Sequence, residues 1–330
     1  MSLRIALIGG AGHVNYISDG LASLPDASIC AVAPGCAAED VSRLRRLGGA
    51  AHAKVYADYH ELLAVEHPDL AAVSPFYYLH AEVSAAALRA GAAVYCEKPL
   101  ALTFASLAEV RLALEETDRP LGIMLNYRYL PAFYTARRLV AAGAIGEPTV
   151  GYAQKSYKRG VRPDFYRRRD TFGGITPWVG IHAIDFLRWI SGHDYVSVSS
   201  RHVKLHCPDY PDMEDAATCM FELDNGGSAV MSFDFLRPAG APSHGDDRLR
   251  LLGDRGALEI RGESSLELIT ASGVQTVPLE TPPYGPFADF ARALLDPTHV
   301  CAISSEEALR VTEIALKTRE AADTGQRLAL

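Results

Sequence analysis

A polar stripe on one predicted helix carries side chains that could do chemistry. Its four residues are spaced four, three and four positions apart, which places them on one helical face: Trp178, His182, Asp185 and Trp189. The opposite face is apolar and suits a core, so the stripe must face something else. An imidazole has an ordinary pKa of about 6.5, which suits proton exchange at neutral pH. The preceding residues predict that Thr176 caps this helix and that Pro177 takes its first position.

A glycine turn near the N-terminus is a candidate phosphate site. The apolar run 4–8 leads into Gly9-Gly10-Ala11-Gly12, and a helix is expected over 14–24. Backbone N–H groups of such a turn, together with the positive end of a helix, can approach a pyrophosphate. The third glycine of the dinucleotide fingerprint is missing, and tight turns also use glycine for steric reasons alone. The position of the turn, directly after the first strand of a long α/β alternation, favours dinucleotide binding.

The second strand does not select between NAD and NADP. The run 28–33 ends in Pro34, where an acid would hold the two ribose hydroxyls of NAD. The sequence therefore predicts that the affinities for NAD and NADP differ by less than about tenfold. A larger preference for NAD would require another acid, such as Glu39 or Asp40. Nearby arginines could reach a 2′-phosphate, although a solvated helix face accounts for them better: Arg43, Arg45 and Arg46.

The elements that must position these residues differ between the two parts of the chain. Residues 1–125 alternate between apolar strands, at 4–8, 28–33, 70–74, 93–96 and 121–125, and helices, at 14–24, from about 37, at 59–66, after 80 and at 106–116. This alternation predicts right-handed βαβ units and an α/β domain with a doubly wound parallel sheet of the Rossmann type. We expect the dinucleotide there.

Residues 126–330 predict a different architecture. After a helix ending near 142 and the stripe helix, strand-like runs follow one another at 196–204, 216–223, 227–235, 248–252 and 257–260. Asp224-Asn225-Gly226-Gly227 is typical of a tight hairpin turn. The pattern predicts an α+β domain with a large, open, mostly antiparallel sheet. A terminal helix is expected over 306–322 and could pack back on the first domain.

Composition excludes several classes of protein. The chain of 330 residues, with 48% hydrophobic and 22% charged residues, is long enough for two globular domains. A formal charge of −8 without a long basic tract argues against a nucleic-acid partner. There is no apolar run of the roughly 18 residues that a membrane span needs, and we expect a cytoplasmic protein. The six cysteines are scattered, so neither a metal site nor a disulfide framework is indicated.

Two motifs together indicate a family. Glu97-Lys98-Pro99-Leu100 follows the strand at 93–96, and a Gly-x-His-x-x-Asp pattern containing His182 comes roughly 80 residues later. On these motifs the chain resembles the Gfo/Idh/MocA oxidoreductases, the family of glucose–fructose oxidoreductase and inositol dehydrogenase. The resemblance covers almost the whole length and includes further segments: the glycine turn, Ser74-Pro75 with His80, Asn126-Tyr127-Arg128, Asn225-Gly226 and Thr324-Gly325.

The resemblance implies an NAD(P)-dependent dehydrogenase that moves a hydride between nicotinamide and a hydroxyl-bearing carbon of a sugar, polyol or inositol-like small molecule. It implies that Lys98 steadies the developing alkoxide and that His182 is the general acid/base. The implied cofactor-binding residues are Gly9, Gly10, Gly12, His13, Val14, Ser74, Pro75, His80, Glu97, Lys98 and Arg128. The implied substrate-binding residues are Tyr127, Lys155, Tyr157, Arg169, Trp178 and His182. A cis Lys98–Pro99 bond and a homodimer or homotetramer formed through the second domain's sheet are also expected.

One departure from the family pattern stands beside His182. Many members have an aspartate four residues before the histidine, whereas this chain has Trp178. An indole can stack on a sugar or nicotinamide but cannot accept a proton, so we expect Trp178 to shape the substrate pocket. Asp185 either orients His182 or has a structural role. Tyr157 and Tyr166 are possible replacement acids.

Two other functions stay open. A cofactor- or ligand-binding regulatory homologue with little catalysis would explain Trp178, Pro34 and the missing glycine together. A reductase of a conjugated or aromatic substrate is suggested by the aromatic residues expected near the cleft. Several basic residues of the second domain also hint at an anionic substrate: Lys155, Arg159, Arg168 and Arg169. Turnover with a panel of polyols separates the enzyme from the regulatory protein.

Overall fold

A computed structural model describes residues 2–330 and divides into two compact units. The first unit contains residues 1–125 and Tyr284–Glu313, and the second contains Asn126–Pro283 and Ile314–Leu330. The division falls inside the helix α9 (Ser305–Thr324), which therefore contributes residues to both units. No helix among residues 2–330 is long and apolar enough to cross a membrane.

The first unit is built on a parallel sheet of six strands in the order β3-β2-β1-β4-β5-β6. The strands are β1 (Leu3–Ile8), β2 (Ala27–Ala33), β3 (Lys54–Val55), β4 (Leu70–Val73), β5 (Ala93–Cys96) and β6 (Leu121–Ile123). Every residue of β4 and β5 is buried, as expected for strands covered on both faces. The order reverses between β1 and β4, which is the switch point of a doubly wound sheet. The predicted fold class is confirmed for this unit.

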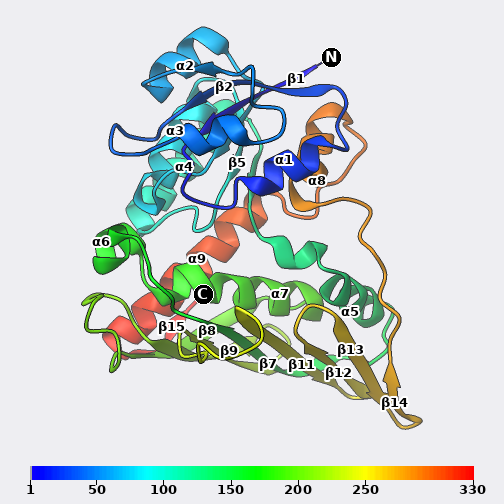
Figure 1. The fold of residues 1–330 in the computed structure, drawn as a ribbon. Helices are drawn as coiled ribbons and strands as arrows, with labels where there is room; N and C mark the ends of the chain where they lie inside the picture. Colours follow the sequence, from blue (N-terminus) through cyan, green and yellow to red (C-terminus); the bar gives the residue numbers. More distant parts are fainter. Residues whose placement is uncertain (1) are drawn as a thin grey trace. The chain divides into compact units, whose positions relative to one another are not determined.

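Helices of the first unit flank this sheet (Figure 1). They are α1 (Asn15–Leu21), α2 (Tyr59–Glu66), α3 (His80–Arg89), α4 (Phe104–Thr117) and α8 (Pro286–Leu295), with 3₁₀ turns η1 (Ser42–Arg46) and η2 (Tyr77–Leu79). The prediction of a helix from about residue 37 is wrong, because this region forms only the short 3₁₀ turn η1 at Ser42–Arg46. α8 packs on α1 so closely that a Cβ on Gly20 would lie 2.8 Å from the Phe287 ring.

The second unit contains a sheet of nine strands in the order β14-β13-β12-β11-β7-β10-β9-β8-β15. Its strands are β7 (Pro148–Tyr157), β8 (Tyr195–Val203), β9 (Ala216–Leu223), β10 (Ser228–Asp234), β11 (Gly245–Gly253), β12 (Gly256–Arg261), β13 (Ser265–Thr270), β14 (Gly273–Thr276) and β15 (Leu328–Ala329). β10 and β7 pair in parallel, and the other neighbouring strands that the structure describes in this sheet pair antiparallel. The predicted mostly antiparallel sheet is confirmed.

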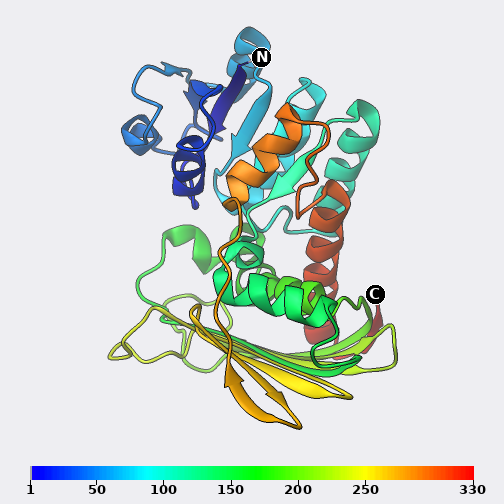
Figure 2. The ribbon, with the colours of Figure 1, turned by 90° about the vertical axis from the view of Figure 1, so that its right-hand side faces the viewer.

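Helices cover one face of this sheet, and the other face is open. α5 (Pro131–Ala141) and α7 (Ile181–Ser191) lie along the covered face in both ribbon views (Figures 1 and 2). Burial alternates along β9, where Phe221 is buried and its neighbour Met220 is 56% exposed. Shorter segments precede and follow α5: η3 (Asn126–Tyr129), η4 (Asp164–Arg167), α6 (Arg169–Phe172) and η5 (Thr176–Gly180).

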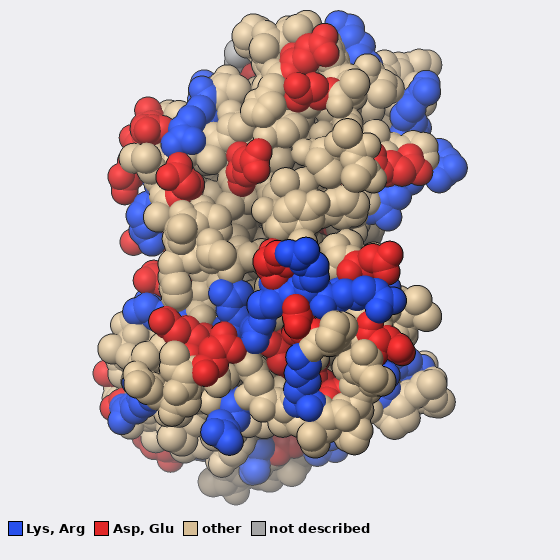
Figure 3. Space-filling view, turned by 90° about the vertical axis from the view of Figure 1, so that its left-hand side faces the viewer, with Lys and Arg blue, Asp and Glu red and all other residues tan. Residues whose placement is uncertain are grey.

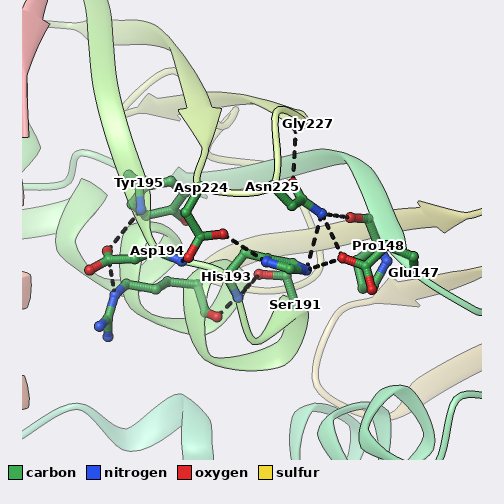
Figure 4. A network of polar contacts seen from close by, with 10 residues as sticks. Glu147, Pro148, Ser191, His193, Asp194, Tyr195, Asp224, Asn225 and Gly227 are labelled. Carbon is green, nitrogen blue, oxygen red and sulfur yellow. Dashed lines mark hydrogen bonds and ion pairs between the residues drawn. The ribbon is translucent and has the colours of Figure 1, made fainter.

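A polar network fixes the end of α7 to the predicted hairpin turn (Figure 4). His193 Nδ1 lies 2.8 Å from Asp224 Oδ1, and His193 Nε2 lies 2.9 Å from Glu147 Oε1. Asn225 Nδ2 donates to the carbonyl of Pro148 at 2.8 Å. The hairpin between β9 and β10 is confirmed, and these contacts attach its turn to both β7 and the helix that carries His182.

Candidate active site

The glycine turn after β1 meets the loop after β4 at the switch point of the first sheet. The N–H of Gly12 donates to Ser74 Oγ at 3.0 Å, and the N–H of Ala11 donates to the Ser74 carbonyl at 2.8 Å. Ser74 and Pro75 follow the last residue of β4, Val73. The structure thus brings two of the sequence-predicted segments together at the edge where ligands of doubly wound sheets bind.

Closely packed atoms of the neighbouring loops explain why this turn needs glycine. Gly9 has a φ of +81°, and a Cβ there would lie 2.2 Å from the backbone nitrogen of Pro75. A Cβ on Gly12 would lie 2.5 Å from Ser74 Oγ and 2.6 Å from Glu97 Oε2. Any side chain at either position would therefore collide with the loops after β4 and β5. These glycines serve close packing of the loops, whatever ligand the turn holds.

Glu97 is a buried carboxylate that holds the residue after the glycine turn. Its Oε2 accepts the backbone N–H of His13 at 2.7 Å and lies 2.9 Å from His13 Nδ1. Burial by itself raises the pKa of Glu97, but the charge and hydrogen bonds of His13, with the charge of Lys98, lower it to about 2. Glu97 is therefore ionised at neutral pH. Val14, the next predicted cofactor residue, is buried at the start of α1.

A second buried carboxylate, Glu39, was not among the predicted site residues. Its Oε1 accepts the N–H of Gly10 at 2.7 Å, and its Oε2 accepts the N–H of Gly35 at 2.9 Å. Burial raises its pKa, and the two backbone hydrogen bonds and the charge of Arg43 act in the opposite direction. Arg43 Nη2 donates to the carbonyl of Gly12 at 3.0 Å, so a cation and a carboxylate both contact the turn.

The loop after β5 carries Lys98, which is only 2% exposed. The predicted cis peptide bond between Lys98 and Pro99 is confirmed. His80 ties this loop to the loop after β4, because its Nδ1 lies 2.7 Å from the Pro99 carbonyl and its Nε2 lies 3.1 Å from the Pro75 carbonyl. Burial lowers the pKa of His80. These contacts are those of a positioning residue, and a direct contact between His80 and the cofactor stays a prediction.

In the second unit, the start of the stripe helix differs from the expectation. Thr176–Gly180 forms a π-helical turn, and the residue before it is Ile175, with no side-chain cap. The prediction that Thr176 caps the helix is therefore wrong, because Thr176 lies inside the turn and its hydroxyl has no hydrogen-bond partner among residues 2–330. Such π turns are rare in proteins, and many of those that occur lie at functional sites. This one carries Trp178.

The polar stripe faces η3, the segment that follows β6 in sequence. Arg128 forms an ion pair with Asp185, in which Nη2 and Oδ1 are 2.6 Å apart, and its guanidinium lies 5.6 Å from the centre of the Trp189 ring. The Tyr127 ring lies 5.1 Å from the His182 ring, centre to centre. Asp185 thus pairs with Arg128, and its orientation of His182 stays a prediction. Trp178, His182 and Asp185 are buried, and Trp189 is half-buried. The part of Arg128 in cofactor binding stays a prediction.

A buried polar trio lies beside His182. Lys155, which is fully buried, has its Nζ 2.8 Å from Asp247 Oδ2, and the hydroxyl of Tyr127 hydrogen-bonds to both side chains. Lys155 and Asp247 are direct partners in the register between β7 and β11. Burial raises the pKa of Tyr127 well above its ordinary value. Tyr127 therefore connects Lys155 and Asp247, which lie on the sheet, to the His182 ring on which it packs.

Trp178 lies among aromatic rings. Its indole centre is 5.5 Å from the Tyr166 ring and 5.6 Å from the Phe235 ring. The guanidinium of Arg162 lies over the same group, 5.0 Å from the indole centre. Tyr157 is farther away, at 6.2 Å from Trp178, and also packs on the His244 ring at 5.1 Å. Two of these neighbours, Arg162 and Phe235, were not predicted.

The basic residues that suggested an anionic substrate have acidic partners. Arg169 Nη2 lies 2.7 Å from Glu214 Oε1 and 3.0 Å from Asp323 Oδ1. Arg159 lies 3.8 Å from Asp215, Arg168 pairs with Asp170, and Lys155 pairs with Asp247. On the face that carries α6, basic and acidic side chains lie side by side (Figure 3). These pairs remove the support for an anionic substrate.

The first unit fits a dinucleotide. Its strand order, the glycine turn at the switch point and a buried carboxylate on that turn are the features that such a ligand uses. Together with the open antiparallel sheet of the second unit, they define the class of two-part α/β oxidoreductases.

Comparisons with known proteins identify the family within this class. Residues 3–125 match the oxidoreductase family with an NAD-binding Rossmann fold, and residues 133–259 match the GFO/IDH/MocA C-terminal domain. The chain belongs to the Gfo/Idh/MocA oxidoreductase family. An oxidoreductase of Thermotoga maritima has a similar structure, with a TM-score of 0.94. The two chains are 39% identical, and the match covers 99% of this chain and 100% of that one.

Curated relatives are more distant. The inositol 2-dehydrogenase of Salmonella typhimurium is 26% identical over 203 residues, which are 60% of this chain and 57% of that protein. The chain thus matches less than two thirds of the length of this relative. The myo-inositol dehydrogenase Hyg17 of Streptomyces leeuwenhoekii is 28% identical over 263 residues, which are 78% of this chain and 76% of that protein.

Proposed function

We propose that the protein is an NAD(P)-dependent dehydrogenase or reductase that acts on a hydroxyl-bearing carbon of a sugar, polyol or inositol-like substrate. One observation carries the proposal: Lys98 is buried on a cis-proline turn next to Glu97, whose carboxylate holds the residue after the glycine turn. A cationic side chain is thereby fixed next to the segment that would bind the cofactor. The family membership and the names of the relatives support the same reaction class.

The roles of the residues follow from their chemistry. When bound, the nicotinamide supplies hydride transfer to or from the carbon. The turn at residues 9–13, together with Ser74 and Glu97, would hold the cofactor, since these groups form the edge at the switch point. Lys98 would stabilise negative charge on the substrate oxygen. His182 would take the hydroxyl proton during oxidation and return it during reduction.

The second unit would bind the rest of the substrate. Trp178 fills the place of the family aspartate with an aromatic surface, and stacking on the apolar face of a ring-shaped polyol suits such a surface. Tyr127 and Lys155 would set the position of His182 through packing and hydrogen bonds. Tyr157 would line the same region, because it contacts both Lys155 and Trp178.

A regulatory homologue is the second candidate. The burial of Trp178 among aromatic side chains favours it, because an indole there occupies volume that an aspartate would leave to substrate and water. Such a protein would bind a dinucleotide and a ligand but would not turn over.

Turnover assays distinguish the two candidates. The wild-type protein is incubated with NAD or NADP and a panel of inositols, polyols and aldoses, and the absorbance of the reduced nicotinamide is followed. We expect at least one substrate to be oxidised. His182→Ala should lower kcat by about 100-fold or more, the usual contribution of a positioned acid/base. His206→Ala, which changes an exposed histidine of the same unit, is the control.

Trp178→Asp should change which substrates are accepted without abolishing turnover. Near-normal kcat for His182→Ala over roughly pH 6 to 9, with loss of turnover in Trp178→Ala, would contradict both roles and favour a tyrosine such as Tyr157. Dinucleotide binding without turnover of any substrate in the panel would favour the regulatory homologue.

We also propose that the protein assembles through the open face of the second unit's sheet, as a homodimer or homotetramer. Exposed apolar side chains on that face support this proposal: Tyr152 is 47% exposed, Met220 56% and Val230 44%. A hollow of about 420 Å³ lies on the same face, between Tyr152, Arg250 and Glu259. A second copy of the sheet would remove these side chains from water.

A further inference from the structure

We propose that Glu39 binds the two hydroxyls of the adenosine ribose and makes this chain select NAD over NADP. This inference rests on the proposed dinucleotide-dependent function. It replaces the expectation, based on Pro34, that the two cofactors bind with similar affinity. The ribose-binding acid has moved from the end of β2 into the loop that follows, and its side chain returns to the glycine turn.

The path of this loop brings Glu39 back to the turn. β2 ends at Ala33, and Pro34 follows where an acid would ordinarily stand. Gly35 packs against the loop after β4 so tightly that a Cβ would lie 2.3 Å from Pro75 Cβ. Its N–H donates to Glu39 Oε2 at 2.9 Å, while the N–H of Gly10 donates to Glu39 Oε1 at 2.7 Å. The carboxylate is therefore fixed between the turns that follow β1 and β2.

The geometry of the carboxylate leaves acceptor capacity on both oxygens. An ionised carboxylate has about four acceptor positions. The N–H groups of Gly10 and Gly35 use one on each oxygen, and the Ala11 backbone also lies near the carboxylate. Two neighbouring ribose hydroxyls can donate one hydrogen bond to each oxygen. A 2′-phosphate has no such pair of donors and carries about −1.5 to −2 charges at neutral pH. The buried carboxylate of Glu39 would therefore repel it strongly.

Arg43 is a side chain near the turn that could act in the opposite direction. Its guanidinium donates to the Gly12 carbonyl and could attract a phosphate. Its single charge, however, lies beside the charge of Glu39, whereas the Glu39 carboxylate is fixed by two backbone hydrogen bonds. We therefore expect the carboxylate to decide the preference.

A loop-stabilising role is the competing explanation for Glu39, and a double-mutant cycle separates it from ribose binding. Calorimetry measures the affinities of wild type and Glu39→Gln for NAD, for NADP and for the NAD analogue that lacks the adenosine 2′-hydroxyl. Asp40→Asn is the matched control, because Asp40 is the neighbouring acid, is exposed and bonds only locally to Ser42. Thermal unfolding confirms that each variant is folded.

Ribose binding predicts that wild type and Asp40→Asn bind NAD at least about 100-fold more tightly than NADP. Removing the 2′-hydroxyl should weaken wild-type binding by about tenfold and should have little effect in Glu39→Gln. Glu39→Gln should also lose most of the preference against NADP. These measurements report binding alone and do not depend on finding the substrate.

Three results would overturn the inference. Wild-type affinities for NAD and NADP within tenfold of each other, or a preference for NADP, would show that Glu39 does not select. Equal losses for NAD and for its deoxy analogue in Glu39→Gln would leave the residue a loop-stabilising role only. A Glu39→Gln variant that does not fold leaves the wild-type comparison of NAD with its analogue, where equal affinities reject the contact. If neither dinucleotide binds the wild-type protein, the proposed function fails as well.

Discussion

At the scale of single residues, burial raises the pKa of both buried carboxylates, yet their net pKa shifts are opposite. Glu97 accepts a hydrogen bond from the His13 backbone and lies beside positive charge, and its pKa falls to about 2. Burial raises the pKa of Glu39. Its two backbone hydrogen bonds and the charge of Arg43 lower this pKa by less than burial raises it. A few hydrogen bonds and nearby charges thus decide whether the pKa of a buried carboxylate rises or falls.

The low pKa of Glu97 predicts a pH-dependent contribution to stability. The ordinary pKa of the group is 4.5 and its folded pKa is about 2, so the unfolded chain binds the proton more readily. The contribution is therefore complete above about pH 4.5 and is lost as the pH falls toward 2, at about 1.4 kcal/mol per pH unit. Urea unfolding of wild type and Glu97→Gln, followed by far-UV circular dichroism at pH 3 and pH 5, should show a smaller stability difference at pH 3. A difference that does not change with pH would contradict this cause.

The pair of Lys155 and Asp247 makes a prediction about the second unit. Asp247→Asn should lower the free energy of unfolding by about 3 kcal/mol, because the fully buried ammonium of Lys155 loses its partner. Both tryptophans, Trp178 and Trp189, belong to this unit, so their fluorescence during urea unfolding reports its stability. The control is Asp246→Asn in the same strand, where partly exposed pairs with Arg237 and Arg248 are worth about 1 kcal/mol or less. Equal effects of the two substitutions would show that the buried pair is not special.

Sequence reasoning identified some of the candidate site residues and missed others for physical reasons. Lys98 and His182 belong to short local motifs, so their neighbours in sequence identify them. Asp247 contacts Lys155 only through the register between β7 and β11, and no local pattern fixes a register across 92 residues. Glu39 was visible as a nearby acid, but its return to the glycine turn depends on how the loop after β2 folds.

At the scale of elements, β7 shows how a buried charged residue obscures the pattern of a strand. Its exposed side carries the aromatic Tyr152, whereas its buried side carries the charged Lys155, which interrupts the usual alternation. The sequence did not predict this strand, although it lies near the middle of the sheet. The strands with regular alternation, such as β9 and β10, were predicted well because their buried positions are apolar.

The π turn makes a prediction at the same scale. A Cβ on Gly180 would lie 2.6 Å from Cε2 of Phe233, which is fully buried on β10. Alanine usually favours a helix over glycine, but this contact should make Gly180→Ala destabilising by about 1–3 kcal/mol. Gly240→Ala, which meets nothing within 4 Å, is the control. Tryptophan fluorescence during urea unfolding measures both, and a stabilised Gly180→Ala would show that Phe233 can move.

At the scale of the whole molecule, each unit has its own sheet and its own part in the proposed chemistry. The alternation of strands and helices was enough to predict the parallel sheet of the first unit. Residues 284–313 belong to the same unit although they follow strands β7 to β14 of the second sheet in sequence. Local patterns carry no signal for this return, because α8 packs through Phe287 and Phe290 against Tyr95, far away in sequence.

The last prediction tests the proposed assembly. Val230 lies on the open face of the sheet, between β7 and β9, and is 44% exposed. Val230→Asp would place a charge where a second copy of the sheet is proposed to pack, and an unpaired carboxylate buried in an apolar contact costs several kcal/mol. We therefore expect light scattering coupled to gel filtration to show an oligomer for wild type and a smaller species for Val230→Asp. Val161→Asp, at a valine that is 96% exposed and lies outside the sheet, should leave the wild-type mass unchanged. A wild-type monomer, or an unchanged mass for Val230→Asp with normal folding, would show that this face is not the site of assembly.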